Sequence, residues 1–207
     1  MLIHTITCGP FDTNAYILSC PMTKESVIID PGVESFDRIV SYLEKNHLHL
    51  KAIFLTHSHW DHIGDVFDLK AKYQIPVYIH EADQANLENP GSDQLPLFFP
   101  IKGTKADHLI KEGDILSFGN IQLTVLETPY HSPGSVCFYE PNEKLLISGD
   151  SLFQGNIGNY SFPTSEPKKM SSSLAKLAQL PPDTKVYPGH GGPTTIRAEQ
   201  TTFRQFM

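Results

Sequence analysis

The sequence has few of the features that mark specialised classes of protein. Its three cysteines form no Cys-x-x-Cys pair, so a disulfide framework is not expected. We expect Cys8, Cys20 and Cys137 to be small core residues of a protein in the reducing cytoplasm. No apolar run approaches the ~20 residues that cross a bilayer, and the first residues lack the pattern of a secretory signal. A membrane is therefore not an expected partner.

Basic residues are also scarce. The 207 residues include 16 Lys and Arg against 23 Asp and Glu, a formal net charge of -7. A surface of this sign repels phosphate backbones, so nucleic acid is not an expected partner. The remaining composition is that of a globular protein, and we expect one domain spanning residues 1–207. Composition leaves the oligomeric state open.

The sequence does contain a dense group of metal-binding side chains. His57, His59, Asp61 and His62 follow directly on the apolar run 51–55, which is predicted to be a buried strand. Imidazole nitrogens and carboxylate oxygens suit zinc and neighbouring divalent metals. A single Asp in a loop is more often solvated or a helix cap, and Asp61 precedes a predicted helix at 64–73. Four such residues together favour a metal site.

Three further predicted strands, 121–127, 144–148 and 184–187, also lead into potential ligands. Because strand ends in a layered α/β protein share an edge, ligands far apart in sequence can meet there. Seven ligands are too many for one tetrahedral ion, but they suit two ions joined by a carboxylate or a hydroxide. The expected metal ligands are His57, His59, Asp61, His62, His131, Asp150 and His190.

Hydrophobic periodicity predicts two rounds of strands with helices between them. The predicted helices are 35–46, with Ser35 as its cap, then 64–73, 81–87, 168–179 and 195–206. Asp30 ends a predicted strand and is either a turn former or a partner that orients a ligating histidine. His80 also ends a strand, and without a companion ligand nearby we interpret it as structural. The irregular stretch 89–105 carries several aromatics that either form a lid or interface or fill a gap in the core.

Four motifs in this chain resemble those of the metallo-β-lactamase fold hydrolases. The most specific is His-x-His-x-Asp-His at 57–62, and the others are Thr-Pro-Tyr-His-Ser-Pro-Gly-Ser at 128–135, Ser-Gly-Asp-Ser-Leu-Phe at 148–153 and Tyr-Pro-Gly-His-Gly-Gly-Pro at 187–193. The resemblance spans nearly the whole chain and implies a four-layer αββα sandwich with the metal site at one edge. It implies that one ion is held by His57, His59 and His131, the other by Asp61, His62 and His190, and that Asp150 bridges them.

Within that family the chain is most similar to glyoxalase II and its short bacterial relatives, the hydroxyacylglutathione hydrolases. The resemblance implies thioester hydrolysis of a small-molecule substrate by a hydroxide between two divalent ions, with Zn²⁺ expected and Fe or Mn as alternatives. Asp61 would be catalytic by orienting the hydroxide. The bridging Asp150 is usually absent from members that hydrolyse β-lactams, which argues against antibiotic breakdown.

The chain departs from the glyoxalase II pattern in ways that bear on the substrate. It shows no counterpart of the helical carboxyl-terminal domain that carries basic residues for glutathione. Residues 158–161 replace the usual Gly-Arg-Thr-Asp, and Tyr130 replaces a usual Gly. Candidate substrate contacts are Lys102, Asn159, Tyr160 and Arg197.

Three alternatives to thioester hydrolysis stay open from the sequence. One is a persulfide dioxygenase with a single iron, for which His57, His131 and Asp150 would supply a two-His, one-carboxylate face. Another is a hydrolase of a different ester or of a phosphodiester, which the acidic charge disfavours. The third is a binding module with a structural metal, which a seven-ligand set disfavours because structural sites are smaller and closed.

Overall fold

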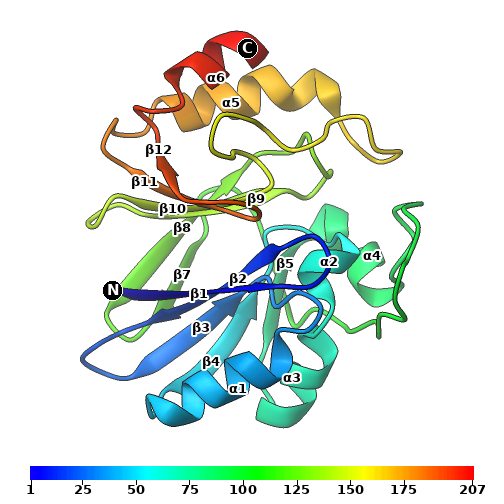
Figure 1. The fold of residues 1–207 in the computed structure, drawn as a ribbon, viewed down its shortest axis with the longest axis vertical. Helices are drawn as coiled ribbons and strands as arrows, with labels where there is room; N and C mark the ends of the chain where they lie inside the picture. The colour runs from blue at the N-terminus through cyan, green and yellow to red at the C-terminus, as the bar shows by residue number, and fades with distance from the viewer.

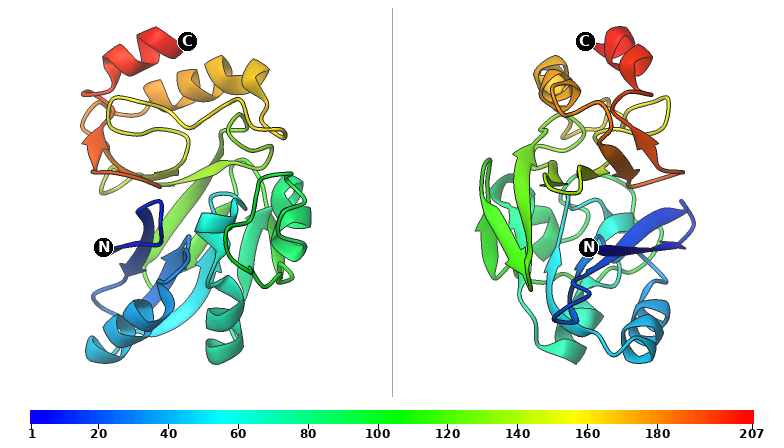
Figure 2. Two further views of the ribbon diagram at one scale, coloured as in Figure 1. Left: turned by 45° about the vertical axis from the view of Figure 1, so that its right-hand side comes forward. Right: turned by 90° about the vertical axis from the view of Figure 1, so that its left-hand side faces the viewer.

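Two six-stranded β-sheets face each other in the computed structural model, which describes residues 1–207 (Figure 1). Helices α1 (Phe36–Lys45) and α3 (Val66–Tyr73) lie against the outer face of one sheet, and α5 (Met170–Ala178) and α6 (Gln200–Phe206) lie against the outer face of the other (Figures 1 and 2). This arrangement confirms the predicted αββα sandwich.

Each predicted round of strands builds one sheet, except that the strand at 108–110, predicted as the start of the second round, joins the first sheet. The first sheet has the order β1 (Leu2–Cys8), β2 (Thr13–Ser19), β3 (Glu25–Ile29), β4 (His49–Phe54), β5 (Val77–His80), β6 (His108–Ile110). The second has the order β12 (Thr194–Thr195), β11 (Lys185–Pro188), β10 (Leu145–Gly149), β9 (Val136–Glu140), β8 (Ile121–Glu127), β7 (Ile115–Phe118). The short helices are α2 (Trp60–Ile63), α4 (Gln84–Glu88), η1 (Glu81–Asp83) and η2 (Pro167–Lys169).

Three apolar clusters separate the four layers. In strand β2, Tyr16 and Leu18 point into the cluster between the two sheets, whereas Ala15 and Ile17 point into the cluster under α1 and α3. This alternation follows from the two-residue period of a strand, and it explains why every residue of β2 is buried. The third cluster, which includes Leu174 of α5 and Phe203 of α6, covers the second sheet. Cys8, Cys20 and Cys137 are buried and unpaired, as predicted.

The helix predicted at 64–73 begins two residues later, as α3 at Val66, and Gly64 and Asp65 form a turn between it and the short α2. A Cβ on Gly64 would come within 2.6 Å of the Val33 nitrogen, so the backbone approach there requires glycine. The Asp65 carboxylate accepts hydrogen bonds from the backbone nitrogens of Ser35 (2.7 Å) and Phe36 (2.8 Å). Ser35 occupies the cap position of α1 but makes no capping bond with its own side chain, so the predicted side-chain cap was wrong.

The closing helix predicted at 195–206 begins only at Gln200. Thr194 and Thr195 instead pair with β11, and the Ile196 nitrogen donates to the Thr184 carbonyl at 3.1 Å. Tertiary pairing with a neighbouring strand therefore overrides the local helical pattern. None of the helices has the length and apolar character needed to span a bilayer.

Replacing Asp65 should destabilise the protein by removing the acceptor at the start of α1. We expect Asp65→Ala to lower the free energy of unfolding by about 1–2 kcal/mol, the usual cost of losing an N-terminal cap. Urea denaturation followed by circular dichroism measures this. The control is Asp68→Ala, because Asp68 is 43% exposed and its pair with Lys102 at the surface should contribute less. Equal losses in the two variants would contradict the capping role.

Candidate metal centre

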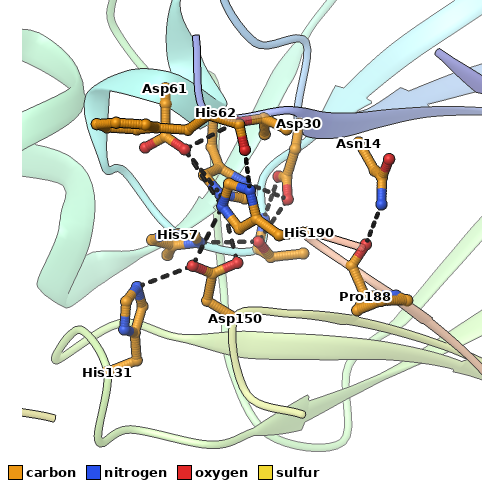
Figure 3. Close-up of polar contacts among 12 residues, drawn as sticks. Asn14, Asp30, His57, Asp61, His62, His131, Asp150, Pro188 and His190 are labelled. Atoms are coloured by element: carbon orange, nitrogen blue, oxygen red, sulfur yellow. Dashed lines mark hydrogen bonds and ion pairs between the residues drawn. The ribbon is translucent and has the colours of Figure 1, made fainter. Parts of the chain in front are cut away.

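The structure brings all seven predicted ligands together at one edge of the sandwich, and Figure 3 labels all of them except His59. His57 to His62 lie on the loop and short helix after β4, His131 follows β8, Asp150 follows β10 and His190 follows β11. Six of the seven are buried, and the His190 side chain is 26% exposed. The cluster is thus closed except beside His190.

Six of the seven side chains fall into two groups of three, each with ligand atoms within 4.8 Å of one another, and a further group of this kind joins Asp30 to His57 and His62. We call His57, His59 and His131 the first triad, and Asp61, His62 and His190 the second triad. The Asp150 carboxylate lies between them, with Oδ2 3.3 Å from His131 Nε2 and 3.5 Å from His190 Nε2, and with Oδ1 3.4 Å from His62 Nε2. This is the arrangement expected of a carboxylate that bridges two ions.

Several of these polar atoms are buried without any hydrogen-bond partner. They are Nε2 of His57, His59 and His131, and Oδ1 of Asp150. A buried polar atom without a partner costs on the order of 1–3 kcal/mol. A divalent ion would satisfy these atoms, and imidazole with carboxylate is a ligand set that suits zinc, iron or manganese. The residues present therefore fit a metal.

The two triads differ in their affinity for protons. Burial lowers the pKa of His59 to about 3 and holds that of His57 well below its usual value, so both rings are neutral, as metal ligands must be. Burial disfavours charge on His190 too, but hydrogen bonds to Asp150 and Asp61 raise the His190 pKa to about 10. Burial opposes ionisation of Asp61, yet the neighbouring His62 and His190 lower its pKa to about 2. Despite the burial of His62, the carboxylates beside it raise its pKa as well, so a cation held in the second triad would take the place of protons on its histidines.

Asp30 orients two parts of the metal-binding loop. Its carboxylate accepts from the Thr56 nitrogen at 2.8 Å and from Thr56 Oγ1 at 2.6 Å, and it lies 3.1 Å from His62 Nδ1. Asp30 also has a φ of 51°, so it forms the turn as well. Both roles considered from the sequence therefore hold, and His62 keeps Nε2 free for the cluster.

Backbone carbonyls orient two further histidines. His131 Nδ1 lies 2.7 Å from the Asn159 carbonyl, and His190 Nδ1 lies 2.9 Å from the Phe11 carbonyl. Sequence reasoning missed these partners because any residue type can supply a carbonyl. It also missed Thr13, whose hydroxyl donates to Asp61 Oδ2 at 2.8 Å from strand β2.

Strand β2 also ties the two sheets together beside the cluster. Asn14 Nδ2 donates to the carbonyls of Pro188 (3.0 Å) and Gly191 (2.9 Å), which flank His190 (Figure 3). Gly189 has no room for a side chain, because a Cβ would come within 2.1 Å of Asp150 Oδ1. The hydrogen bonds from Asn14 and the tight packing of Gly189 against Asp150 therefore fix the backbone that carries His190.

The other residues singled out from the sequence lie outside the cluster. His80 Nε2 is 3.1 Å from Glu127 Oε1 and its Nδ1 accepts from the Ala82 nitrogen, so it is a strand-end residue as predicted. Lys102 pairs with Asp68 at the surface. Tyr130, which stands where the resemblance led us to expect Gly, is fully buried and donates a hydrogen bond to the Ser151 carbonyl. Its side chain therefore supports the segment that carries Asp150 and does not line a substrate site.

The 89–105 stretch fills part of the core, one of the two roles considered for it. Ile101 packs against the core cluster under α1 and α3. Phe98 is 63% exposed, and its ring lies 5.6 Å from that of Trp60 and 6.2 Å from that of Phe11. The stretch thus fills part of the core and also presents aromatics beside the metal-binding loop.

Known proteins share both sequence and structure with this chain. Residues 8–190 match the profile described as the metallo-beta-lactamase superfamily. A probable metallo-hydrolase, YqgX of Bacillus subtilis, is 38% identical over 195 residues, which are 93% of this chain and 91% of that protein. Hydroxyacylglutathione hydrolase GloC of Haemophilus influenzae is 32% identical over 186 residues, covering 86% and 85% of the two chains.

Two solved structures superpose closely on the fold. The crystal structure of the BLEG-1 B3 metallo-beta-lactamase matches with a TM-score of 0.89 and 39% identity, covering 97% of each chain. The structure of TTHA1623 in a di-iron-bound form matches with a TM-score of 0.83 and 38% identity, covering 95% of this chain and 96% of the other. On sequence and structure together, this chain belongs to the metallo-β-lactamase superfamily.

Proposed function

We propose that this metallo-hydrolase cleaves thioesters of the hydroxyacylglutathione type. The observation that carries the proposal is the pair of triads meeting at Asp150, with buried ligand atoms that lack any other partner. The similarity to GloC, which is named as a hydroxyacylglutathione hydrolase, supports the thioester. The similarity to the di-iron form of TTHA1623 supports a two-ion centre and supports iron as an alternative to zinc.

The two triads and Asp150 would hold the ions, and the remaining chemistry belongs to the residues around them. Two divalent ions bound there would lower the pKa of a shared water towards neutrality and polarise the substrate carbonyl. Asp61, ionised at neutral pH, is the acceptor that orients the attacking water. The Thr13 hydroxyl fixes Asp61 by donating to Oδ2. A thiolate is a good leaving group, so no strong general acid is needed.

Hydrolysis of a β-lactam is the second candidate. The similarity to the BLEG-1 B3 metallo-beta-lactamase favours it. Against it stands Asp150, a carboxylate placed between the two triads. We place thioester hydrolysis first because of that carboxylate.

Loss of one ligand from each triad tests the metal assignment. We expect the purified protein to bind two metal ions per chain, and His59→Ala and His190→Ala each to lose about one ion and on the order of 100-fold or more in kcat/KM for S-lactoylglutathione. Elemental analysis and loss of thioester absorbance measure this. The control His80→Ala should retain both ions and activity. Two ions in both ligand variants would disprove the assignment.

The Thr13 hydroxyl allows the role of Asp61 to be tested without removing a ligand. Thr13→Val should lower kcat for the thioester by about 10- to 100-fold, the worth of a hydrogen bond to a charged group. KM and the metal content should change little, and Thr13→Ser should restore most of the rate because it restores the hydroxyl. A kcat unaffected by Thr13→Val would mean that Asp61 needs no such support.

A substrate comparison separates the candidate reactions. With the same metal-loaded protein, we expect kcat/KM for S-lactoylglutathione to exceed that for the β-lactam nitrocefin by roughly 100-fold. Glutathione persulfide should cause no oxygen uptake. Faster nitrocefin cleavage would favour the second candidate, and oxygen uptake with one iron per chain would favour the dioxygenase.

A further inference from the structure

Asp83 is a buried carboxylate that lies close to the metal centre but outside it. It ends the short helix η1 after β5 and is 3% exposed. It forms no ion pair with a Lys or Arg. Instead it accepts four hydrogen bonds, at Oδ2 from the Ser58 nitrogen (2.8 Å), Ser58 Oγ (3.2 Å) and Ser132 Oγ (2.9 Å), and at Oδ1 from the Gly134 nitrogen (2.7 Å). All of its hydrogen bonds thus go to two loops.

These two loops carry the whole first triad. Ser58 stands between His57 and His59, and Ser132 directly follows His131. One loop follows β4 of the first sheet and the other follows β8 of the second sheet. Apart from the bonds through Asp83, the two chain segments are joined here by one hydrogen bond, from the Val136 nitrogen to the Thr56 carbonyl at 2.9 Å. Asp83 therefore connects two ligand-bearing loops from different sheets.

The hydrogen bond between Asp83 and Ser58 fixes the backbone next to His59. Asp83 holds the Ser58 nitrogen, while Asn86 Nδ2 donates to the Ser58 carbonyl at 2.7 Å, so the backbone beside His59 is held from both sides. The other four histidines of the cluster have an acceptor or hydroxyl within 3.1 Å of Nδ1. His59 instead lines a polar cavity of about 80 Å³ together with Asp83, Asn86 and Asp93. Its orientation therefore depends on the backbone of its loop.

The fit around Asp83 leaves little freedom. A Cβ on Gly134 would come within 2.7 Å of Asp83 Oδ1, so only glycine permits this approach. The second triad has separate supports, because Thr13 holds Asp61, Asp30 holds His62 and the Phe11 carbonyl holds His190. A substitution at Asp83 should therefore disturb the geometry of the first triad and leave that of the second triad unchanged.

We infer that Asp83 is a positioning residue that sets the separation of the His57–His59 loop and the His131 loop, and so maintains the first triad for metal binding. The inference rests on the proposed two-metal function. Asp83 itself makes no hydrogen bond to a metal-ligand side chain. An amide in its place would turn an NH₂ group towards a backbone N–H or a serine hydroxyl, which pushes the two loops apart.

The test is a chelator competition that measures the two stepwise dissociation constants for Zn²⁺ on the full chain. We expect Asp83→Asn to weaken one constant by about 10- to 100-fold, the usual effect of losing an outer partner of a ligand, and to leave the other unchanged. The loss in thioesterase kcat/KM should be recovered at raised Zn²⁺. Added to His59→Ala, which already lacks the first triad, Asp83→Asn should leave the remaining constant unchanged.

Asp107→Asn is the matched control, because Asp107 also accepts from a backbone nitrogen, that of Val77 at 2.8 Å, and lies away from the cluster. It should alter neither constant. Should Asp83→Asn fold poorly, Ser132→Ala removes one of the four bonds and should give a smaller selective loss. If Asp83→Asn weakens both constants equally, or weakens neither, the positioning role of Asp83 is overturned and the proposed function stands. A wild-type chain that binds no pair of ions would overturn the proposed function as well.

Discussion

The contact between the two sheets is the interaction on which the rest of the structure depends. Tyr16 and Leu18 of the first sheet share one apolar cluster with Phe138 and Ile147 of the second. Burial of this surface fixes how the sheets face each other, and therefore which strand ends lie at the same edge. The metal centre forms where the ends of β4, β8, β10 and β11 converge.

That convergence places polar groups where burial is costly. Imidazoles and carboxylates from both sheets lie within a few ångströms of one another, and several have no partner in the protein. Outer contacts limit the cost by fixing most of these side chains: Asp30 directly after β3, Thr13 from β2 and backbone carbonyls from two loops. The cluster thus combines a rigid outer layer with inner atoms that only a cation would satisfy.

Much of the site follows from local patterns that need no tertiary information. A strand that ends in His-x-His-x-Asp-His is itself a group of ligands, and His131, Asp150 and His190 each follow a strand and have Gly or Pro within two residues. The predicted helix bounds that proved wrong are those of segments with a competing tertiary partner. Residues 64–73 look helical throughout, yet α3 begins only at Val66 and the Asp65 carboxylate bonds to the start of α1; Thr195 looks helical, yet it pairs with β11.

By itself the sequence determined most of the strands and helices, the three buried unpaired cysteines and the identity of the seven clustered side chains, because each depends on residue type and short spacing. The motif resemblance implied the division into two triads, and only the tertiary structure decided which groups besides Asp30 support them. Asp83, Thr13 and the carbonyls of Phe11 and Asn159 have no local signature. Their roles arise because packing of the two sheets brings them within hydrogen-bond distance of loops far away in the chain.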